Sequence, residues 1–244
     1  MVSKKKAFLI HCSASMVVVA VFCALVFCIW YPSPLFGALG VTSIVLLLIG
    51  IDAVLGPLLT LLVYRPGKRT LRFDMSVIIV IQAGAFLYGA YSVAQGRPAW
   101  IVFNADRFDV VTAVTLDERG LDAARVEYRS APLLGPGWVA AFPPSEIEAR
   151  NSILFEAVIA GIDLPQRPEY YRSLSEAAEA IRKQARPLVE LKRHNPDLDM
   201  ERMRSDWPKA DAYLPLMGRV KAQVVLIERA SAEVLGIVDL NPWE

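Results

Sequence analysis

Apolar residues dominate the first 95 positions of the 244-residue chain, where they form three runs separated by short polar segments. The runs cover residues 7–30, 36–63 and 75–93. A helix needs about 20 predominantly apolar residues to cross the hydrocarbon core of a bilayer. The pattern therefore predicts a bundle of three transmembrane helices over residues 1–93.

Lysines precede the first run at positions 4, 5 and 6, as they do in a cleaved secretory leader. A leader has an apolar segment of about 7–15 residues, followed by a small-residue cleavage site. The run here is longer, and no such site follows it. We therefore expect the first helix to remain uncleaved in the membrane.

The sequence after position 93 is more polar and mixes two periodicities. Runs rich in Val, Ile, Phe and Thr predict strands at 99–103, 109–116, 126–128, 138–142, 223–227 and 234–240, the last two forming a terminal β-hairpin. Capping-box patterns predict helices that open at Ser145 and Ser173, and a short helix is predicted over 199–207. Residues 94–244 are thus expected to form one α+β domain with an antiparallel sheet.

The distribution of charge predicts an orientation. The net charge of +1 divides into +5 for residues 1–93 (seven Lys or Arg against two Asp) and −4 for the remainder (19 against 23). The cations of the first part lie beside the apolar runs, at 4–6 and 65–72. By the positive-inside rule these segments face the cytoplasm. We therefore expect a multi-pass protein of a bacterial inner membrane, with a cytoplasmic N-terminus and a periplasmic C-terminal domain.

Residues suited to catalysis are sparse. All three cysteines lie in the first apolar run, which leaves no disulfide framework and no cysteine metal site in the second domain. His194 is the only histidine of that domain, and the acidic stretch 197–201 lacks the glycine that a calcium loop needs next. We expect no enzymatic activity, no cofactor and no metal. No basic patch marks the second domain, so no nucleic-acid partner is expected.

Asp52 is an exception inside the second run, one turn before Gly56 and Pro57. A charge at membrane depth costs about 2.5–3.5 kcal/mol even on insertion-based scales, and a proline removes one backbone donor from the helix. Three interpretations are open: Asp52 holds the three helices together, captures a helix of another protein, or belongs to a proton path. The last lacks a second intramembrane acid.

Depth suggests a partner for Asp52. At 1.5 Å per residue, Asp52 lies roughly 16 Å above the end of its run, Gln82 about 10 Å into the third run, and His11 about 6 Å into the first. Gln82 is therefore the better candidate, together with Ser15, which lies at a similar depth.

Three groups of residues carry a family resemblance. The first is Asp52, Gly56, Pro57, Leu58 and Thr60; the second is Asp74, Gln82, Tyr88, Gly89, Arg97, Pro98, Val102, Phe103, Asp106, Arg107 and Phe108; the third is Val225, Arg229, Glu233, Val234, Leu235, Gly236, Pro242 and Trp243. Together they resemble the type IV pilin accessory proteins of the TfpX/TfpZ type. The first two groups are the more specific.

The resemblance implies an inner-membrane, chaperone-like protein that binds its cognate type IV major pilin and supports pilus assembly or stability. Other inner-membrane pilus assembly proteins and the lipid bilayer are implied as further partners. It also makes a set of residues candidates for partner binding: Asp52, Gly56, Pro57, Gln82, Tyr88, Gly89, Arg97, Asp106, Arg107 and Phe108.

A second function remains open on the sequence alone. A periplasmic α+β domain behind three membrane helices also suits a ligand sensor that acts through a separate signalling partner. Its cytoplasmic segments, 1–6 and 65–72, are too short to hold an output domain.

Overall fold

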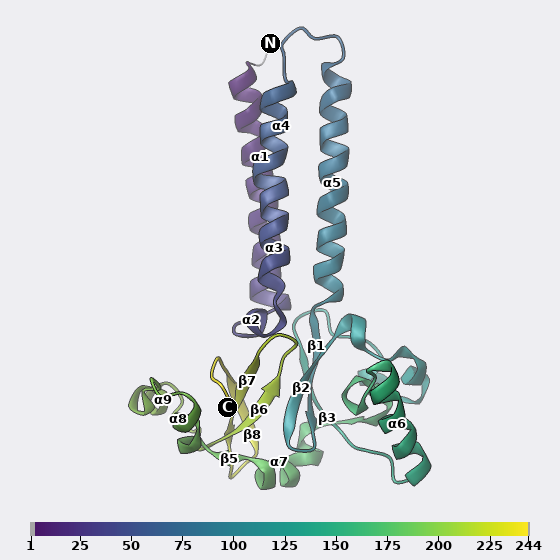
Figure 1. The fold of residues 1–244 in the computed structure, drawn as a ribbon, viewed down its shortest axis with the longest axis vertical. Helices are drawn as coiled ribbons and strands as arrows, with labels where there is room; N and C mark the ends of the chain where they lie inside the picture. The colour runs from purple at the N-terminus through teal and green to yellow at the C-terminus, as the bar shows by residue number, and fades with distance from the viewer. Residues whose placement is uncertain (1–2, 244) are drawn as a thin grey trace. The chain divides into compact units, whose positions relative to one another are not determined.

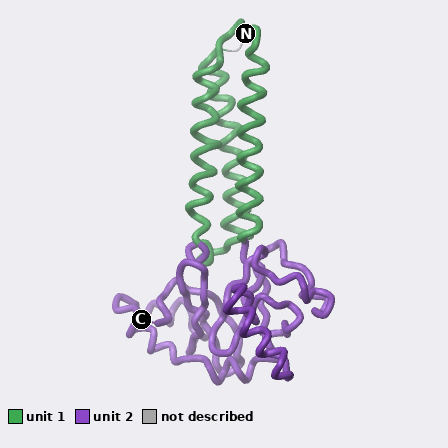
Figure 2. Tube along the Cα trace, turned by 45° about the vertical axis from the view of Figure 1, so that its right-hand side comes forward, with its two compact units in different colours: residues 1–36, 40–96 green, residues 37–39, 97–244 purple. Residues whose placement is uncertain are grey.

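The chain folds into two compact units, described here by a computed structural model for residues 3–243. Figure 2 distinguishes them: the first comprises residues 1–36 and 40–96, and the second comprises residues 37–39 and 97–244. The first unit is helical and the second contains the sheet (Figure 1).

Three helical stretches of the first unit are long and apolar enough to cross a membrane: Lys4–Trp30, Val41–Val63 and Leu71–Gln95. The first stretch consists of α1 (Lys4–Leu25) and a π-helical turn, Val26–Trp30. The second consists of α3 (Val41–Ile49), a π-helical segment at Gly50–Leu55, and α4 (Gly56–Val63). The third is the single helix α5 (Leu71–Gln95). The sequence-based start of the second run, at 36, is too early. Gly40 has a φ of 69° and separates the short α2 (Leu35–Leu39) from α3, because glycine adopts the left-handed conformation without penalty.

The interior of this bundle contains polar as well as apolar side chains, and its outer surface is largely apolar. Ser15, Asp52 and Thr60 are buried, as are Phe22 and Val45, while large aliphatic residues such as Leu62 and Val80 are exposed. A water-soluble helix bundle instead has a polar outer face. The apolar outer surface here suits helices that meet hydrocarbon.

The helices pack through small residues and aromatic contacts. α1 packs on α4, and α5 packs on α3 and α4. A Cβ atom added to Gly89 would come within 2.8 Å of the Leu48 side chain, so the absent side chain permits the close approach of α3 and α5. Between α1 and α5, the rings of Phe22 and Phe86 meet edge to face at 5.3 Å.

The second unit is built on one mixed sheet. Its strand order is β4–β3–β1–β2–β6–β7–β8, and β5 pairs with β6 beside that path. The strands are β1 (Pro98–Asn104), β2 (Arg107–Thr112), β3 (Gly137–Ala141), β4 (Tyr171–Arg172), β5 (Arg186–Pro187), β6 (Ala212–Met217), β7 (Ala222–Glu228) and β8 (Glu233–Val238). Two pairs are parallel, β1 with β3 and β2 with β6. The expected antiparallel sheet is therefore only partly right.

One strand prediction was wrong, and one central strand was missed. Residues 126–128 form a 3-10 turn rather than a strand, in which Tyr128 packs edge to face on Trp100 at 5.7 Å. The central strand β6 was not predicted; it contains Pro215, and proline is rare inside a sheet. The fold tolerates this proline since the β2 ladder reaches β6 only at Leu216 and Met217.

The helices of this unit surround the sheet: α6 (Ile147–Ala160), α7 (Ala178–Gln184), α8 (Leu191–His194) and α9 (Met200–Asp206). The capping box at Ser173 forms as expected, although it opens a 3-10 turn that continues into α7. The one at Ser145 does not form, because α6 begins after Glu146 without a side-chain cap. Asp199 caps α9 by accepting hydrogen bonds from two backbone N–H groups, both at 3.0 Å.

Candidate functional site

The polar side chains of the three long helices meet at Gln82. Its side-chain amide donates hydrogen bonds to the main-chain oxygen of Asp52 (3.0 Å) and to the hydroxyl of Ser15 (3.2 Å). Its Oε1 lies 3.0 Å from His11 Nε2. One side chain of α5 thus joins α1 to the π-helical segment between α3 and α4.

His11 extends the cluster to α4. Its Nδ1 lies 2.5 Å from the hydroxyl of Thr60, which is completely buried. The two ring nitrogens of His11 therefore face Thr60 and Gln82 at once. The depth estimate favoured Gln82 over His11 as the partner of Asp52. In the structure the long side chain of Gln82 reaches both residues, so His11 belongs to the cluster as well.

The observed helix ends also correct the depth estimate for Gln82. α5 begins at Leu71 and α4 ends at Val63, so Gln82 and Asp52 each lie 11 residues from the end of a helix (82 − 71 and 63 − 52). Both are therefore about 16 Å deep. The Asp52–Gln82 pairing argued from depth agrees with this contact, although the acceptor is the main chain of Asp52.

The carboxylate of Asp52 is buried without a complete set of partners. The residue is only 4% exposed, and within the described residues its Oδ2 atom has no hydrogen-bond partner. Buried polar atoms are nearly always hydrogen-bonded. The Oδ2 atom of Asp52 is therefore an exception, a buried acceptor to which no described residue donates a hydrogen bond.

Gly56 and Pro57 shape the backbone that carries Asp52. The N–H of Gly56 donates to the carbonyl of Ile51, five residues earlier, which defines the π-helical turn. Pro57 has no N–H to donate, and such widened turns are frequent at functional sites. A Cβ atom on Gly56 would overlap the amide group of Gln82, so glycine here leaves room for the central side chain of the cluster.

An apolar groove of about 600 Å³ runs beside the cluster, lined by residues of α1, the π-helical segment, the end of α4 and α5. Its lining residues are Ala7, Ile10, His11, Ala14, Ser15, Val18, Asp52, Tyr64, Met75, Ile79, Gln82, Ala83 and Phe86. Small side chains on both walls let another chain approach closely.

The remaining candidate residues of α5 do not join this cluster. Tyr88 is exposed, whereas Gly89 lies against Leu48. Both follow Gln82 by about two turns of the same helix. The structure therefore gives Gly89 a packing role.

The other four candidate residues lie in the second unit. Arg97 directly precedes β1, Asp106 lies in the tight turn after β1, and Arg107 and Phe108 begin β2. Phe108 is completely buried and packs edge to face on Trp138 at 5.4 Å. Arg107 pairs with Asp109 at 3.2 Å, and burial raises the pKa of that aspartate. The Arg97 Nε donates to the carbonyl of Pro132 at 3.4 Å.

The turn before Arg107 is strained. Ala105 has a φ of 54°, a conformation that residues other than glycine rarely adopt. The side chain of Asp106 beside it is exposed. Asp106 is therefore exposed at the tip of the turn, while the buried Phe108 holds the base of the turn in the sheet.

An ion-pair network connects α6 to the turns below the sheet. Arg119 pairs with Asp117 at 2.8 Å and with Glu156 at 2.5 Å, and Arg167 also reaches Glu156 at 2.8 Å. Hydrogen bonds from Arg119 lower the pKa of both Asp117 and Glu156. Burial raises the pKa of the neighbouring Glu169. These charges stabilise the fold and leave the outer face of α6 free.

Within residues 3–243, no group of three or more His, Cys, Asp or Glu side chains could hold a metal ion. A second hollow of about 670 Å³ lies beside His194, between α8, α9 and the end of β8. Asn195 closes its edge through two hydrogen bonds with the Asn241 backbone, both at 2.9 Å.

The fold and the cluster define a class: a protein with three membrane-length helices that share a polar centre and carry a separate mixed-sheet domain. Similarity to known proteins then identifies the family within this class. Residues 1–40 match the family described as Fimbrial assembly protein FimB. No solved structure matches the chain.

Similarity to curated proteins extends much further along the chain. It is 36% identical to the fimbrial assembly protein of serogroup I from Dichelobacter nodosus over 185 residues, which cover 74% of this chain and 71% of that one. The serogroup E1 protein gives the same identity and coverage. The protein of serogroups C1 and C2 is 38% identical over 113 residues, covering 45% and 86%. The chain belongs to this family of fimbrial assembly proteins, in agreement with its resemblance to type IV pilin accessory proteins.

Proposed function

We propose that this protein spans a bacterial inner membrane with its sheet domain in the periplasm, and that it binds its cognate type IV major pilin during pilus assembly. Family membership supports the role in assembly. Binding of pilin in a chaperone-like manner, without enzymatic activity, is the finer part of the proposal. Other inner-membrane assembly proteins are proposed as further partners.

The observation that carries the finer part is the orphan Asp52 carboxylate oxygen beside an open groove. The three helices are joined through Gln82, and its acceptor on Asp52 is a main-chain oxygen. The Oδ2 atom of the Asp52 carboxylate takes no part in that hydrogen bond. A pilin awaiting assembly carries an apolar helix in the membrane, and polar groups near its start would find a partner here.

Crosslinking tests the contact directly. A photo-crosslinking residue at Ile79, which lines the groove, is expected to capture pilin in cells, whereas the same residue at the exposed Ile81 is not. Capture only from positions in the sheet domain would contradict binding in the groove. The two sites are two residues apart on α5, so expression and depth are closely matched.

A genetic experiment tests the role as a whole. Deletion of the gene is expected to reduce surface pili made from the cognate pilin and to leave those of an unrelated pilin intact. Unchanged piliation in both strains would refute the proposal. Equal loss in both strains would instead indicate a general assembly factor.

A further inference from the structure

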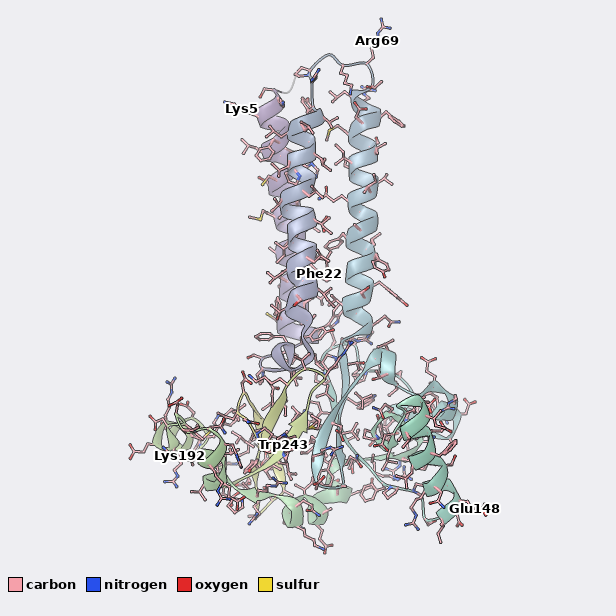
Figure 3. All side chains as sticks on the ribbon, in the orientation of Figure 1. Lys5, Phe22, Arg69, Glu148, Lys192 and Trp243 are labelled. Carbon is pink, nitrogen blue, oxygen red and sulfur yellow. The ribbon has the colours of Figure 1, made fainter. Side chains whose placement is uncertain are left out.

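One end of the groove lies close to a cluster of positively charged side chains, for which the family relationship gives no reason. Its lining begins with Ala7 on α1, Tyr64 at the end of α4 and Met75 on α5. These residues are followed or preceded within six positions by exposed cations, on the helix ends and in the loop between α4 and α5: Lys4, Lys5, Lys6, Arg65, Lys68, Arg69 and Arg72. Figure 3 shows Lys5 and Arg69 at the same end of the bundle.

Little acidic charge offsets these cations. Asp74 is the only carboxylate in the segment 64–75, and it is engaged by Lys68 at 2.6 Å. Six of the seven cations are left to attract another anion. Juxtamembrane clusters of four to eight Lys or Arg attract anionic lipid, at about 1 kcal/mol for each cation near the surface.

The length of the groove matches one leaflet. Along α5 it extends from Met75 to Phe86, which is 11 residues or about 16 Å. The hydrocarbon core of a bilayer is about 30 Å thick, so half of it is about 15 Å. The contact between Phe22 and Phe86 lies at the inner end.

The surface of the groove is suited to a hydrocarbon chain. Most lining side chains are aliphatic or aromatic, and Asp52, the one carboxylate among them, is buried below the surface. The volume of about 600 Å³ is within the range of small-molecule sites, roughly 300–1,000 Å³. A transmembrane helix about 30 Å long would extend well beyond it.

We propose that this groove and its basic rim form a binding site for an anionic phospholipid of the leaflet on the basic side. One acyl chain lies between α1 and α5, and the phosphate-bearing headgroup meets the cations around Arg65 and Arg72. The observations that support lipid binding do not depend on the binding of pilin. Competition between lipid and pilin for the groove would be a further consequence, and only that consequence rests on the proposed function.

Native mass spectrometry of the full-length protein tests the site, with dioleoyl-phosphatidylglycerol and the zwitterionic dioleoyl-phosphatidylethanolamine as probes. The protein is expected to retain phosphatidylglycerol at least tenfold better. Substituting both Arg65→Gln and Arg72→Gln is expected to remove most of this preference, because each cation contributes about fivefold. Arg65→Lys with Arg72→Lys is expected to keep it.

A substitution that fills the groove distinguishes lipid bound at this specific site from lipid that surrounds the helices without a defined site. Ala83→Phe adds bulk in the groove and is expected to abolish retention of phosphatidylglycerol. Gly84→Phe adds the same bulk at a position with nothing within 4 Å of an added Cβ, and is expected to retain it. Equal retention of the two lipids by the unaltered protein, or retention unaffected by Ala83→Phe, would overturn the proposal. The experiment contains no pilin, so its failure would leave the proposed function standing.

Discussion

At the scale of single residues, the structure distinguishes the main chain of Asp52 from its carboxylate. The main-chain oxygen accepts a hydrogen bond from Gln82, while Oδ2 of the carboxylate has no partner among the described residues. The link between helices thus depends on the side chain of Gln82. The sequence left three alternative roles open for the residue as a whole. In the proposed function, Oδ2 is the atom that a donor of the partner would meet.

Substitution of Asp52 tests this separation. Asp52→Asn keeps the shape and the main-chain acceptor, so the melting temperature of the purified protein is expected to change by no more than a few degrees, while surface pili are lost. Gln82→Leu, the matched control for the link, removes three observed contacts and is expected to destabilise the bundle by about 1–3 kcal/mol. A large loss of stability in Asp52→Asn would show that its carboxylate serves the fold.

Gly56 gives a second test at this scale. Gly56→Ala is expected to displace the amide of Gln82 and to cost more than the gain of about 1 kcal/mol that alanine normally brings to a helix interior. Gly84→Ala meets nothing within 4 Å and should show that gain. Thermal unfolding in detergent, followed for both variants, checks the difference in sign. A stabilised Gly56→Ala protein would contradict the tight fit at Gln82.

At the scale of elements, the π-helical segment before α4 and the outer face of α6 stand out. The π turn accommodates Pro57 and lets the second stretch continue to Val63. On α6, Leu154, Phe155, Val158 and Ile159 are exposed, Val158 by 86%. The ion pairs of Glu156 attach this helix by its other face.

The pH dependence of the sheet domain is expected to follow that network. The folded pKa of Asp117 lies below its unfolded value, so its contribution is present above the unfolded pKa and is lost as pH falls through the folded one. Asp117→Asn should therefore cost about 1 kcal/mol at pH 7 and much less at pH 3. Pulse proteolysis in urea at the two pH values measures this, with Glu118→Gln at an exposed neighbouring position as control. An equal cost at both pH values would contradict the assignment.

At the scale of the whole molecule, the chain divides into a helical unit and a sheet unit. In the proposed orientation the basic segments 4–6 and 65–72 lie on the cytoplasmic side of the membrane and the sheet unit on the other. Alkaline phosphatase, which folds only where its disulfides form, is expected to be active when fused after the last residue and inactive when inserted in the 65–72 segment. The opposite pattern would reverse the proposed orientation.

Much of this arrangement was accessible from the sequence because it depends on local pattern. Three apolar runs determined the three long helices, and alternating residues with turn signals determined the terminal hairpin and the strands β1 and β3. The capping preferences of Ser173 and Asp199 also act over only a few residues. Such features depend on interactions between residues close together in the sequence, so the sequence alone is enough to predict them.

Tertiary structure decided the features that depend on distant neighbours. The parallel pairing of β2 with β6 joins segments about a hundred residues apart, and the missed strand β6 is stabilised by those partners despite Pro215. The same holds for the convergence of His11, Thr60 and Gln82, which was not foreseen as one network. Sequence placed an acid and an amide at membrane depth, but only the packing of α1, α4 and α5 showed which of their atoms meet. An orphan oxygen and an open groove are properties of that packing, because burial and contact exist only once the helices are assembled.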